Sequence, residues 1–209
     1  ALGGSYARKL SDQFSLAISG RYIYSNLTGG QQAGEYSTKP GQAAAADISG
    51  FYSKPVRMGS QDMDLAVGFN LSNIGSKISY TETSTSDFIP INMRLGTALG
   101  TDIDDYNEIS LALDINKLLV PTPPIYANDN SGEIVAGKDP DVAVVSGIFQ
   151  SFGDAPGGFK EEMREINYSI GSEYWYNDQF AVRAGYFFEH STKGGRKFFT
   201  FGSGVKYSA

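Results

Sequence analysis

Apolar and polar residues alternate along most of the chain, in stretches of about ten residues that are separated by clusters of turn-forming residues. In the clearest stretch, Phe180, Val182 and Tyr186 share one face, while Arg183 and Gly185 lie on the other. Such alternation with a period of two predicts β-strands with one apolar face. The chain is therefore predicted to be all-β and antiparallel, with about nine strands at 2–10, 14–27, 44–54, 64–80, 91–101, 106–117, 165–176, 179–191 and 196–208.

The length of these stretches favours strands that cross a membrane. A tilted strand needs ~9–11 residues to cross a bilayer, whereas strands of globular proteins average ~5–6 residues. Tyrosine and phenylalanine gather towards the strand ends, as aromatic girdles do in outer-membrane barrels. A soluble β-sandwich also alternates and stays the alternative, but the strand length and the girdle predict a transmembrane β-barrel in a bacterial outer membrane.

The face opposite the apolar one carries glycine, serine, asparagine and single charges, as expected of a barrel lumen. Charges of both signs at similar depth are expected to form ion pairs that fill and brace such a lumen. The charged residues predicted to line it are Arg21, Asp47, Arg94, Asp114, Glu173, Arg183, Glu189 and Lys206.

The connections between the strands indicate the orientation of the barrel. Short turns follow one end of the strands, and long polar links at 28–43, 81–90 and 117–164 follow the other, with exceptions at 54–63 and 192–195. Outer-membrane barrels place short turns in the periplasm and long loops outside. Residues 1–209 are therefore predicted to be part of a single barrel domain with a long extracellular loop at 117–164. Nine antiparallel strands cannot close on themselves, so a larger barrel is expected.

The stretch 64–80 changes its parity midway. Leu65 to Leu71 are apolar at odd positions, whereas Ile74 and Ile78 are apolar at even ones. A β-bulge at 73–75 would produce this change because it inserts one extra residue into a strand. Two shorter strands that are separated by a turn remain the alternative.

The segment 117–164 does not alternate. Its prolines bar strand pairing, Asp139 and Pro140 predict the start of a helix, and a second short helix is predicted from about Phe159 to Arg164. The apolar face of these helices must be buried, either against the mouth of the barrel or against another protein. The residues predicted to bind a partner protein are Leu118, Leu119, Val120, Pro121, Pro123, Pro124, Phe149, Phe152 and Phe159.

Composition excludes several chemistries. The chain has no cysteine and one histidine, which excludes disulfides and thiolate metal sites and argues against a histidine zinc site. Its formal net charge is −6, and its bases are scattered, so no nucleic-acid partner is expected. No cofactor, metal or catalytic constellation is predicted, and the protein is not expected to be an enzyme.

Five strings together resemble one protein family: FNLSNIGSKISY (69–80), DINKLLVPTPP (114–124), FQSFGDAPGGFKEEMREI (149–166), EYWYNDQFAVRAGYFFE (173–189) and KGGRKFFTFGSGVKY (193–207). They are similar to the PorV (LptO) family, outer-membrane proteins of the type IX secretion system of Bacteroidetes with a FadL-like fold. That fold has 14 strands, so the resemblance implies that this chain supplies about nine of them.

The resemblance implies a carrier that works at the cell surface. Proteins of this family bind the C-terminal signal domains of secreted cargo, associate with the SprA (Sov) translocon barrel, and deliver cargo to the attachment complex that contains PorU. Contact with membrane lipid and lipopolysaccharide is implied as well.

Two other functions stay open. A FadL-like channel for hydrophobic compounds would use the bulge at 73–75 as a lateral opening. A lipopolysaccharide deacylase would use His190 and Ser191, but neighbouring residues on one strand point to opposite faces and do not readily share a proton.

Overall fold

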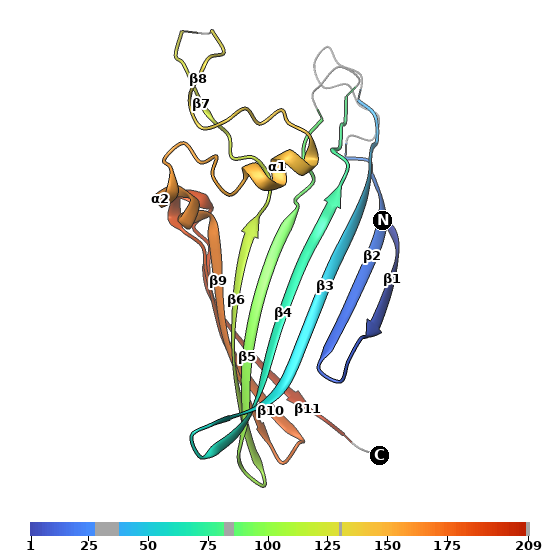
Figure 1. Ribbon diagram of the computed structural model, residues 1–209, viewed down its shortest axis with the longest axis vertical. Coiled ribbons are helices and arrows are strands. Elements are labelled where there is room, and N and C mark those ends of the chain that lie inside the picture. The colour runs from blue at the N-terminus through green and yellow to red at the C-terminus, as the bar shows by residue number, and fades with distance from the viewer. Residues whose placement is uncertain (28–37, 82–85, 130, 208–209) are drawn as a thin grey trace.

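The computed structural model describes residues 1–27, 38–81, 86–129 and 131–207. Across these residues, nine strands form one antiparallel sheet in the order β1-β2-β3-β4-β5-β6-β9-β10-β11 (Figure 1). The all-β antiparallel prediction with nine strands is thereby confirmed. The strands are β1 (Leu2–Lys9), β2 (Phe14–Ser25), β3 (Gly41–Met58), β4 (Gln61–Gly75), β5 (Asn92–Asp104), β6 (Asn107–Leu118), β9 (Ile166–Tyr176), β10 (Phe180–Phe188) and β11 (Lys197–Val205).

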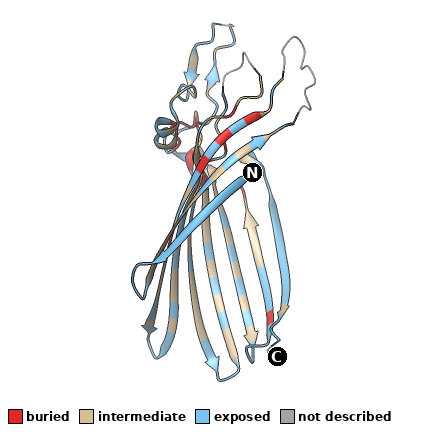
Figure 2. Ribbon diagram, turned by 90° about the vertical axis from the view of Figure 1, so that its right-hand side faces the viewer, coloured by how far each residue is buried: buried red, intermediate tan, exposed pale blue. Residues whose placement is uncertain are grey.

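The sheet curls around a hollow, and β1 and β11 form its two edges (Figures 1 and 2). Pairing between these two edges is not seen in the described part of the chain, so the sheet is open there. Among the residues that the structure describes, there is no helix long and apolar enough to cross a membrane.

The register places apolar residues in rows along the convex face. One row runs across six adjacent strands: Val67, Thr97, Leu113, Ile170, Tyr186 and Phe199. The neighbouring row, on the concave face, holds small residues: Ala66, Ala98, Ala112, Gly171, Gly185 and Thr200. Val182 of the convex face is 60% exposed, which is unlike a side chain in the core of a soluble protein.

The connection between β3 and β4 differs from the prediction. The expected link at 54–63 is a two-residue turn at Gly59 and Ser60, and both strands continue to it. Pro55 lies inside β3, one residue beyond the predicted end of the strand at 54. The N–H of Ser53 still donates to the Gln13 carbonyl, and beyond Ser53 β3 pairs with β4 alone. Proline is tolerated there because a strand with one partner leaves part of its backbone unpaired.

The bulge in β4 is present. Ser72 and Asn73 together oppose Asp47, and Asn73 adopts a φ of 61°. The strand nevertheless ends at Gly75 rather than at residue 80. Ile78 forms only an isolated bridge to Asp87, so residues 76–80 belong to the loop. The predicted long links at 28–43 and 81–90 lie partly outside the described residues.

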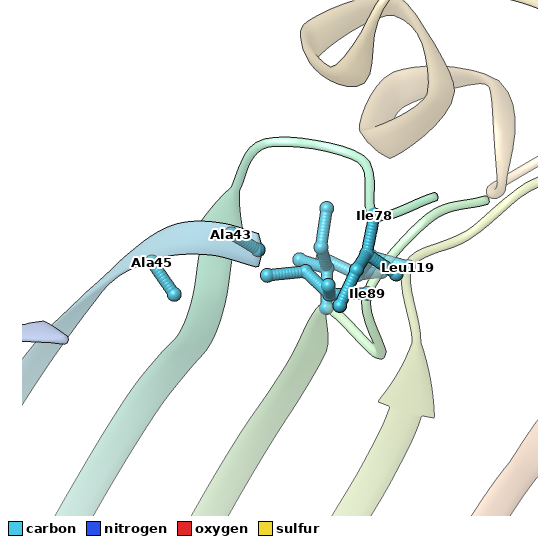
Figure 3. Close-up of a cluster of buried hydrophobic side chains, with 6 residues drawn as sticks. Ala43, Ala45, Ile78, Ile89 and Leu119 are labelled. Atoms are coloured by element: carbon cyan, nitrogen blue, oxygen red, sulfur yellow. The ribbon is translucent and has the colours of Figure 1, made fainter. Parts of the chain in front are cut away.

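The largest group of buried side chains lies at the end of the sheet that carries the long loops, as the red segments in Figure 2 show. Figure 3 shows Ala43 and Ala45 of β3 beside Ile78 and Ile89 of the β4–β5 connection and Leu119, which follows β6. Ile91 completes this mouth cluster. The loops therefore pack on one another and cover this end of the hollow.

The segment 117–164 contains more structure than the two predicted helices. A small hairpin, β7 (Ile125–Tyr126) with β8 (Ile134–Ala136), was not predicted. It is followed by α1 (Val144–Gln150), α2 (Phe159–Glu162) and the 3-10 turn η1 (Met163–Glu165); a second 3-10 turn, η2 (Ser191–Lys193), follows β10.

The start predicted for the first helix is wrong. The carboxylate of Asp139 accepts a hydrogen bond from the backbone N–H of Asp141 at 2.9 Å, which closes a turn, and α1 begins only after Ala143. An aspartate that bonds two residues ahead favours a turn over a helix.

Candidate functional site

A buried group of charges ties the long segment to the sheet. Lys117, at the end of β6, pairs through Nζ with Glu162 Oε2 at 3.1 Å and with Glu165 Oε2 at 2.7 Å. Lys193 of η2 pairs through Nζ with Glu161 Oε1 at 2.6 Å and Glu165 Oε1 at 2.9 Å. We call these five side chains the ion cluster. It joins β6, α2, η1 and η2, and removing one partner would leave a buried charge without compensation.

The turn before α2 is fixed to the same group. The backbone N–H groups of Asp154 and Ala155 both donate to Glu162 Oε1 at 2.7 Å. Asp154 is buried in turn, and its Oδ2 accepts from the backbone N–H of Thr122 at 3.0 Å. The segment is therefore held to itself and to the sheet by hydrogen bonds that water cannot easily replace.

The surroundings shift the pKa values of these groups in different directions. Burial raises the pKa of Glu165, but hydrogen bonds from Lys117, Lys193 and Thr122 outweigh burial and leave it below its ordinary value. A hydrogen bond from Lys193 likewise lowers the pKa of Glu161. Burial raises the pKa of Asp154, because hydrogen bonds from Thr122 compensate only in part. The two glutamates are thus stabilised as anions, whereas the aspartate is not.

Helix α1 rests on the mouth cluster. Val144 and Ile148 pack against the cluster, and a Cβ on Gly147 would come within 2.6 Å of the Phe88 ring. Only a glycine permits this close approach. The opposite side of the helix consequently faces outward, with Val145 and Phe149 exposed.

The three phenylalanines of the predicted partner-binding set are surface residues. Phe149 is 74% exposed, Phe152 is 50% exposed and Phe159 is 80% exposed. Exposed apolar side chains that form a patch mark sites of contact with a partner or a membrane. We call these three residues the aromatic surface.

The proline-rich part of that set behaves differently. Leu119 is only 2% exposed and belongs to the mouth cluster, Pro121 is buried, and Val120 packs against the cluster. Their predicted contact with a partner therefore needs correction, because the backbone turns inward after β6 and uses these side chains for internal packing.

The rest of the proline-rich part lies around a cavity. Leu118 and Pro123 line a cavity of about 350 Å³ together with Lys193 and Arg196. Pro124 is half-buried beside Gly137 of the β7–β8 hairpin. Leu118, on the concave side, is 46% exposed, so this residue faces the hollow rather than the outer surface.

Charges predicted for the lumen form contacts across the concave face. Arg21 Nη2 donates to Asp47 Oδ1 at 2.7 Å and to Asn73 Oδ1 at 2.7 Å, and the N–H of Asn73 donates to Asp47. This network therefore satisfies the backbone that the bulge leaves unpaired. Arg183 pairs with Glu173 on the neighbouring strand.

The other predicted lumen charges are more scattered. Arg94 Nε donates to Asn116 at 3.4 Å, and the side chain of Asp114 lies over Gly96. Two residues are not in strands at all, because β10 and β11 are shorter than predicted. Glu189 follows β10 and pairs with Arg196 at 2.8 Å, and Lys206 follows β11.

His190 and Ser191 also lie beyond the end of β10, contrary to the predicted strand. The Nδ1 atom of His190 accepts from the backbone N–H of Thr192 at 3.2 Å and caps η2. One ring nitrogen is thus engaged locally. Within the described ranges, no three His, Asp or Glu side chains are grouped so as to hold a metal ion.

The ion cluster could not be predicted from the sequence. The spacing of Glu161, Glu162 and Glu165 indicates an acidic helical turn, but its partners Lys117 and Lys193 are 28 or more residues away. Only the packing of β6 and η2 beside this turn brings the opposite charges together.

Comparison with curated proteins found no match for the chain. A family model described as type IX secretion system protein PorV matches residues 1–125, which is more than half of the chain. The match spans β1 to β6 and the start of the segment that covers the hollow. The chain therefore belongs to the PorV family of type IX secretion system proteins.

Proposed function

We propose that this protein is an outer-membrane carrier that binds the C-terminal signal domains of type IX cargo at its aromatic surface. In this proposal it associates with the SprA (Sov) translocon barrel and passes cargo to the attachment complex that contains PorU. Membership of the PorV family supports the assignment to the type IX secretion system and to the outer membrane. The choice of partner and the residues that contact it are our inference.

The arrangement of the sheet supports a position in the membrane. Its convex face carries rows of exposed apolar side chains, such as Leu113 at 47% exposure, which water would disfavour and acyl chains would accept. With that face in lipid, residues 1–209 form part of one barrel domain, and 117–164 lies outside the cell with the other long connections.

The aromatic surface on a rigid base is the observation that carries the proposal. Phe149, Phe152 and Phe159 are exposed, while the segment beneath them is held by the ion cluster and the mouth cluster. Aromatic side chains dominate the energetics of many protein interfaces, and a pre-ordered surface loses less entropy on binding. A folded signal domain would meet a surface that is already formed.

The test is a binding measurement with a purified cargo signal domain. We expect the double variant Phe149→Ala and Phe152→Ala to bind the domain about tenfold or more weakly, because two exposed aromatic anchors are lost. Tyr106→Ala is the matched control, since Tyr106 is 60% exposed but lies in the turn at the other end of β6. Heat-modifiable gel mobility would verify folding, and unchanged binding by a folded double variant would refute the proposal.

The alternatives gain no specific support from the described residues. The bulge that a lateral channel would use is tied by Arg21 and by the Asn73 side chain, which donates to the Pro90 carbonyl at 2.8 Å. Liposome swelling would test the channel. For the deacylase, His190→Ala with full retention of lipid A deacylation would rule out a role for that residue.

A further inference from the structure

The helical turn formed by α2 and η1 has two chemically different sides. Its three acids, Glu161, Glu162 and Glu165, all point into the ion cluster. The remaining side includes Lys160 and Arg164, which are spaced four residues apart and so share one face of the turn. All the acids are therefore used internally, and both bases are left on the outer side.

Two large apolar side chains accompany these bases. Phe159 is 80% exposed and Met163 is 42% exposed. Lys160 is exposed, Arg164 is half-buried, and neither side chain forms an ion pair with any residue that the structure describes. We call Phe159, Lys160, Met163 and Arg164 the rim face. It combines positive charge with apolar surface, and three of its four side chains, those of Phe159, Lys160 and Met163, are exposed.

The rim face lies beside the convex side of the sheet. Lys117 alternates with Asn116 and therefore shares the convex side of β6 with Ile115 and Leu113. Glu162 and Glu165 both pair with Lys117, and Figure 1 shows α2 at the upper end of β9.

The neighbouring strand ends also combine aromatic side chains with a positive charge. Tyr168 and Phe188 are paired on the convex side, and Lys197 is paired with Phe188. The Lys197 ammonium lies 4.9 Å from the centre of the Phe188 ring. Aromatic residues with a nearby cation are typical of the zone where acyl chains meet polar headgroups.

We infer that the rim face binds the headgroup of an anionic, phosphate-bearing lipid at the outer boundary of the membrane. Lys160 and Arg164 would contact the phosphate, while Phe159 and Met163 would contact the first carbons of the acyl chains. This assignment leaves Phe149 and Phe152 of the aromatic surface to the cargo domain. The inference rests on the proposed function for the orientation in the membrane. An acidic protein partner is less well matched, because the face lies beside the apolar convex rows rather than above the mouth.

The experiment compares lipid binding by two variants of equal net charge, in the full-length protein purified in detergent. The test variant carries Lys160→Gln and Arg164→Gln; the control carries Lys9→Gln and Lys138→Gln, two exposed bases elsewhere. The probe is a fluorescent short-chain phosphatidylglycerol, with phosphatidylcholine as the uncharged counterpart. We expect phosphatidylglycerol to bind the test variant about tenfold more weakly than the control, with no change for phosphatidylcholine.

Three results would overturn the inference. The first is equal loss in both variants, which would indicate a general effect of net charge. The second is displacement of phosphatidylglycerol by an equal concentration of inorganic phosphate, which would indicate a site for free phosphate. The third is unchanged lipid binding together with loss of translocon co-purification, which would assign the rim face to a protein. Cargo binding is not needed for these measurements, so failure here is distinct from failure of the proposed function.

Discussion

Glu165 shows how one residue connects separate parts of the chain. Its Oε2 atom accepts from Lys117, and its Oε1 atom accepts from Lys193 and from the Thr122 hydroxyl at 2.8 Å. Both oxygens are therefore occupied as the anion. Protonation would remove the charge that holds both lysines, while Lys117 would remain almost fully buried. The attachment of α2 and η1 should consequently depend on the ionisation of this carboxyl group.

At this scale we predict that acid releases α2 and η1 from the end of the sheet. The pKa values of Glu161 and Glu165 are lowered on folding, so their contribution to stability is present above the ordinary glutamate value of 4.5 and is lost as the pH falls below it. Asp154 acts oppositely: its raised pKa favours the folded state in acid and weakens it as the pH rises through the folded value. Glu161 and Glu165 pair directly with the lysines, whereas Asp154 accepts from a backbone N–H, so we expect net release below about pH 4.5.

A fluorophore on Lys160→Cys would report this release, since the chain has no other cysteine. Its anisotropy should fall as the pH drops below about 4.5. The same label in a Glu165→Gln background should show lower anisotropy at neutral pH and a smaller acid step. A full-sized step in that background would contradict the role given to Glu165.

Among the elements, α1 depends on close packing rather than on intrinsic helix propensity. It is seven residues long and contains a glycine and two valines, which favour helices poorly. Packing on the mouth cluster compensates for this low propensity. The close approach of Phe88 and Pro121 to Gly147 sets the distance between α1 and the residues beneath it. The outward presentation of Phe149 results from that contact.

We predict that Gly147→Val displaces α1. The new Cβ would overlap the Phe88 ring, so overpacking should cost about 1–3 kcal/mol locally and weaken binding of the cargo signal domain. Ser146→Val is the control, because Ser146 is exposed in the same helix and introduces the same side chain. Proteolytic cleavage of the long segment should accelerate for the first variant alone. Equal rates for the two variants would mean that this contact does not hold the helix.

At the scale of the whole molecule, the main contrast is between the side chains on the two faces of the sheet. Convex rows hold branched and aromatic side chains, whereas concave rows hold glycine, alanine and polar side chains that include the Arg21 network. A soluble protein would bury the first face, but in this protein many of its side chains are exposed, from Tyr6 of β1 to Phe199 of β11. Solvation by lipid is the condition under which this arrangement is stable.

We predict that a lysine is tolerated at one of two adjacent residues of β6 and not at the other. Leu113→Lys would place a charge among the convex rows and should destabilise the membrane-embedded protein by about 2–4 kcal/mol. Ala112→Lys would point the same side chain into the hollow and should cost much less. Urea unfolding in lipid vesicles measures both. If Leu113→Lys were neutral or improved solubility in buffer, the convex face would not lie in lipid.

Local periodicity was enough to predict the strands and their faces. Alternation between neighbours such as Leu113 and Asp114 reflects backbone geometry that each strand carries by itself, and the observed register keeps such residues on opposite faces. The bulge was predictable for the same reason, since an extra residue near Asn73 shifts the parity of the positions after it. The exact strand ends were not, because pairing partners beyond Tyr52 decided how far β3 could run.

The sequence by itself thus determined an all-β, antiparallel chain of nine strands with one apolar face, since those properties depend on residues one or two positions apart. Tertiary structure alone decided which loop residues are buried. Leu119 and Phe149 are both apolar members of the long segment, yet one closes the mouth and the other is exposed. Which of them is buried depends on contacts between residues far apart in the chain, such as Lys117 with Glu162 and Gly147 with Phe88.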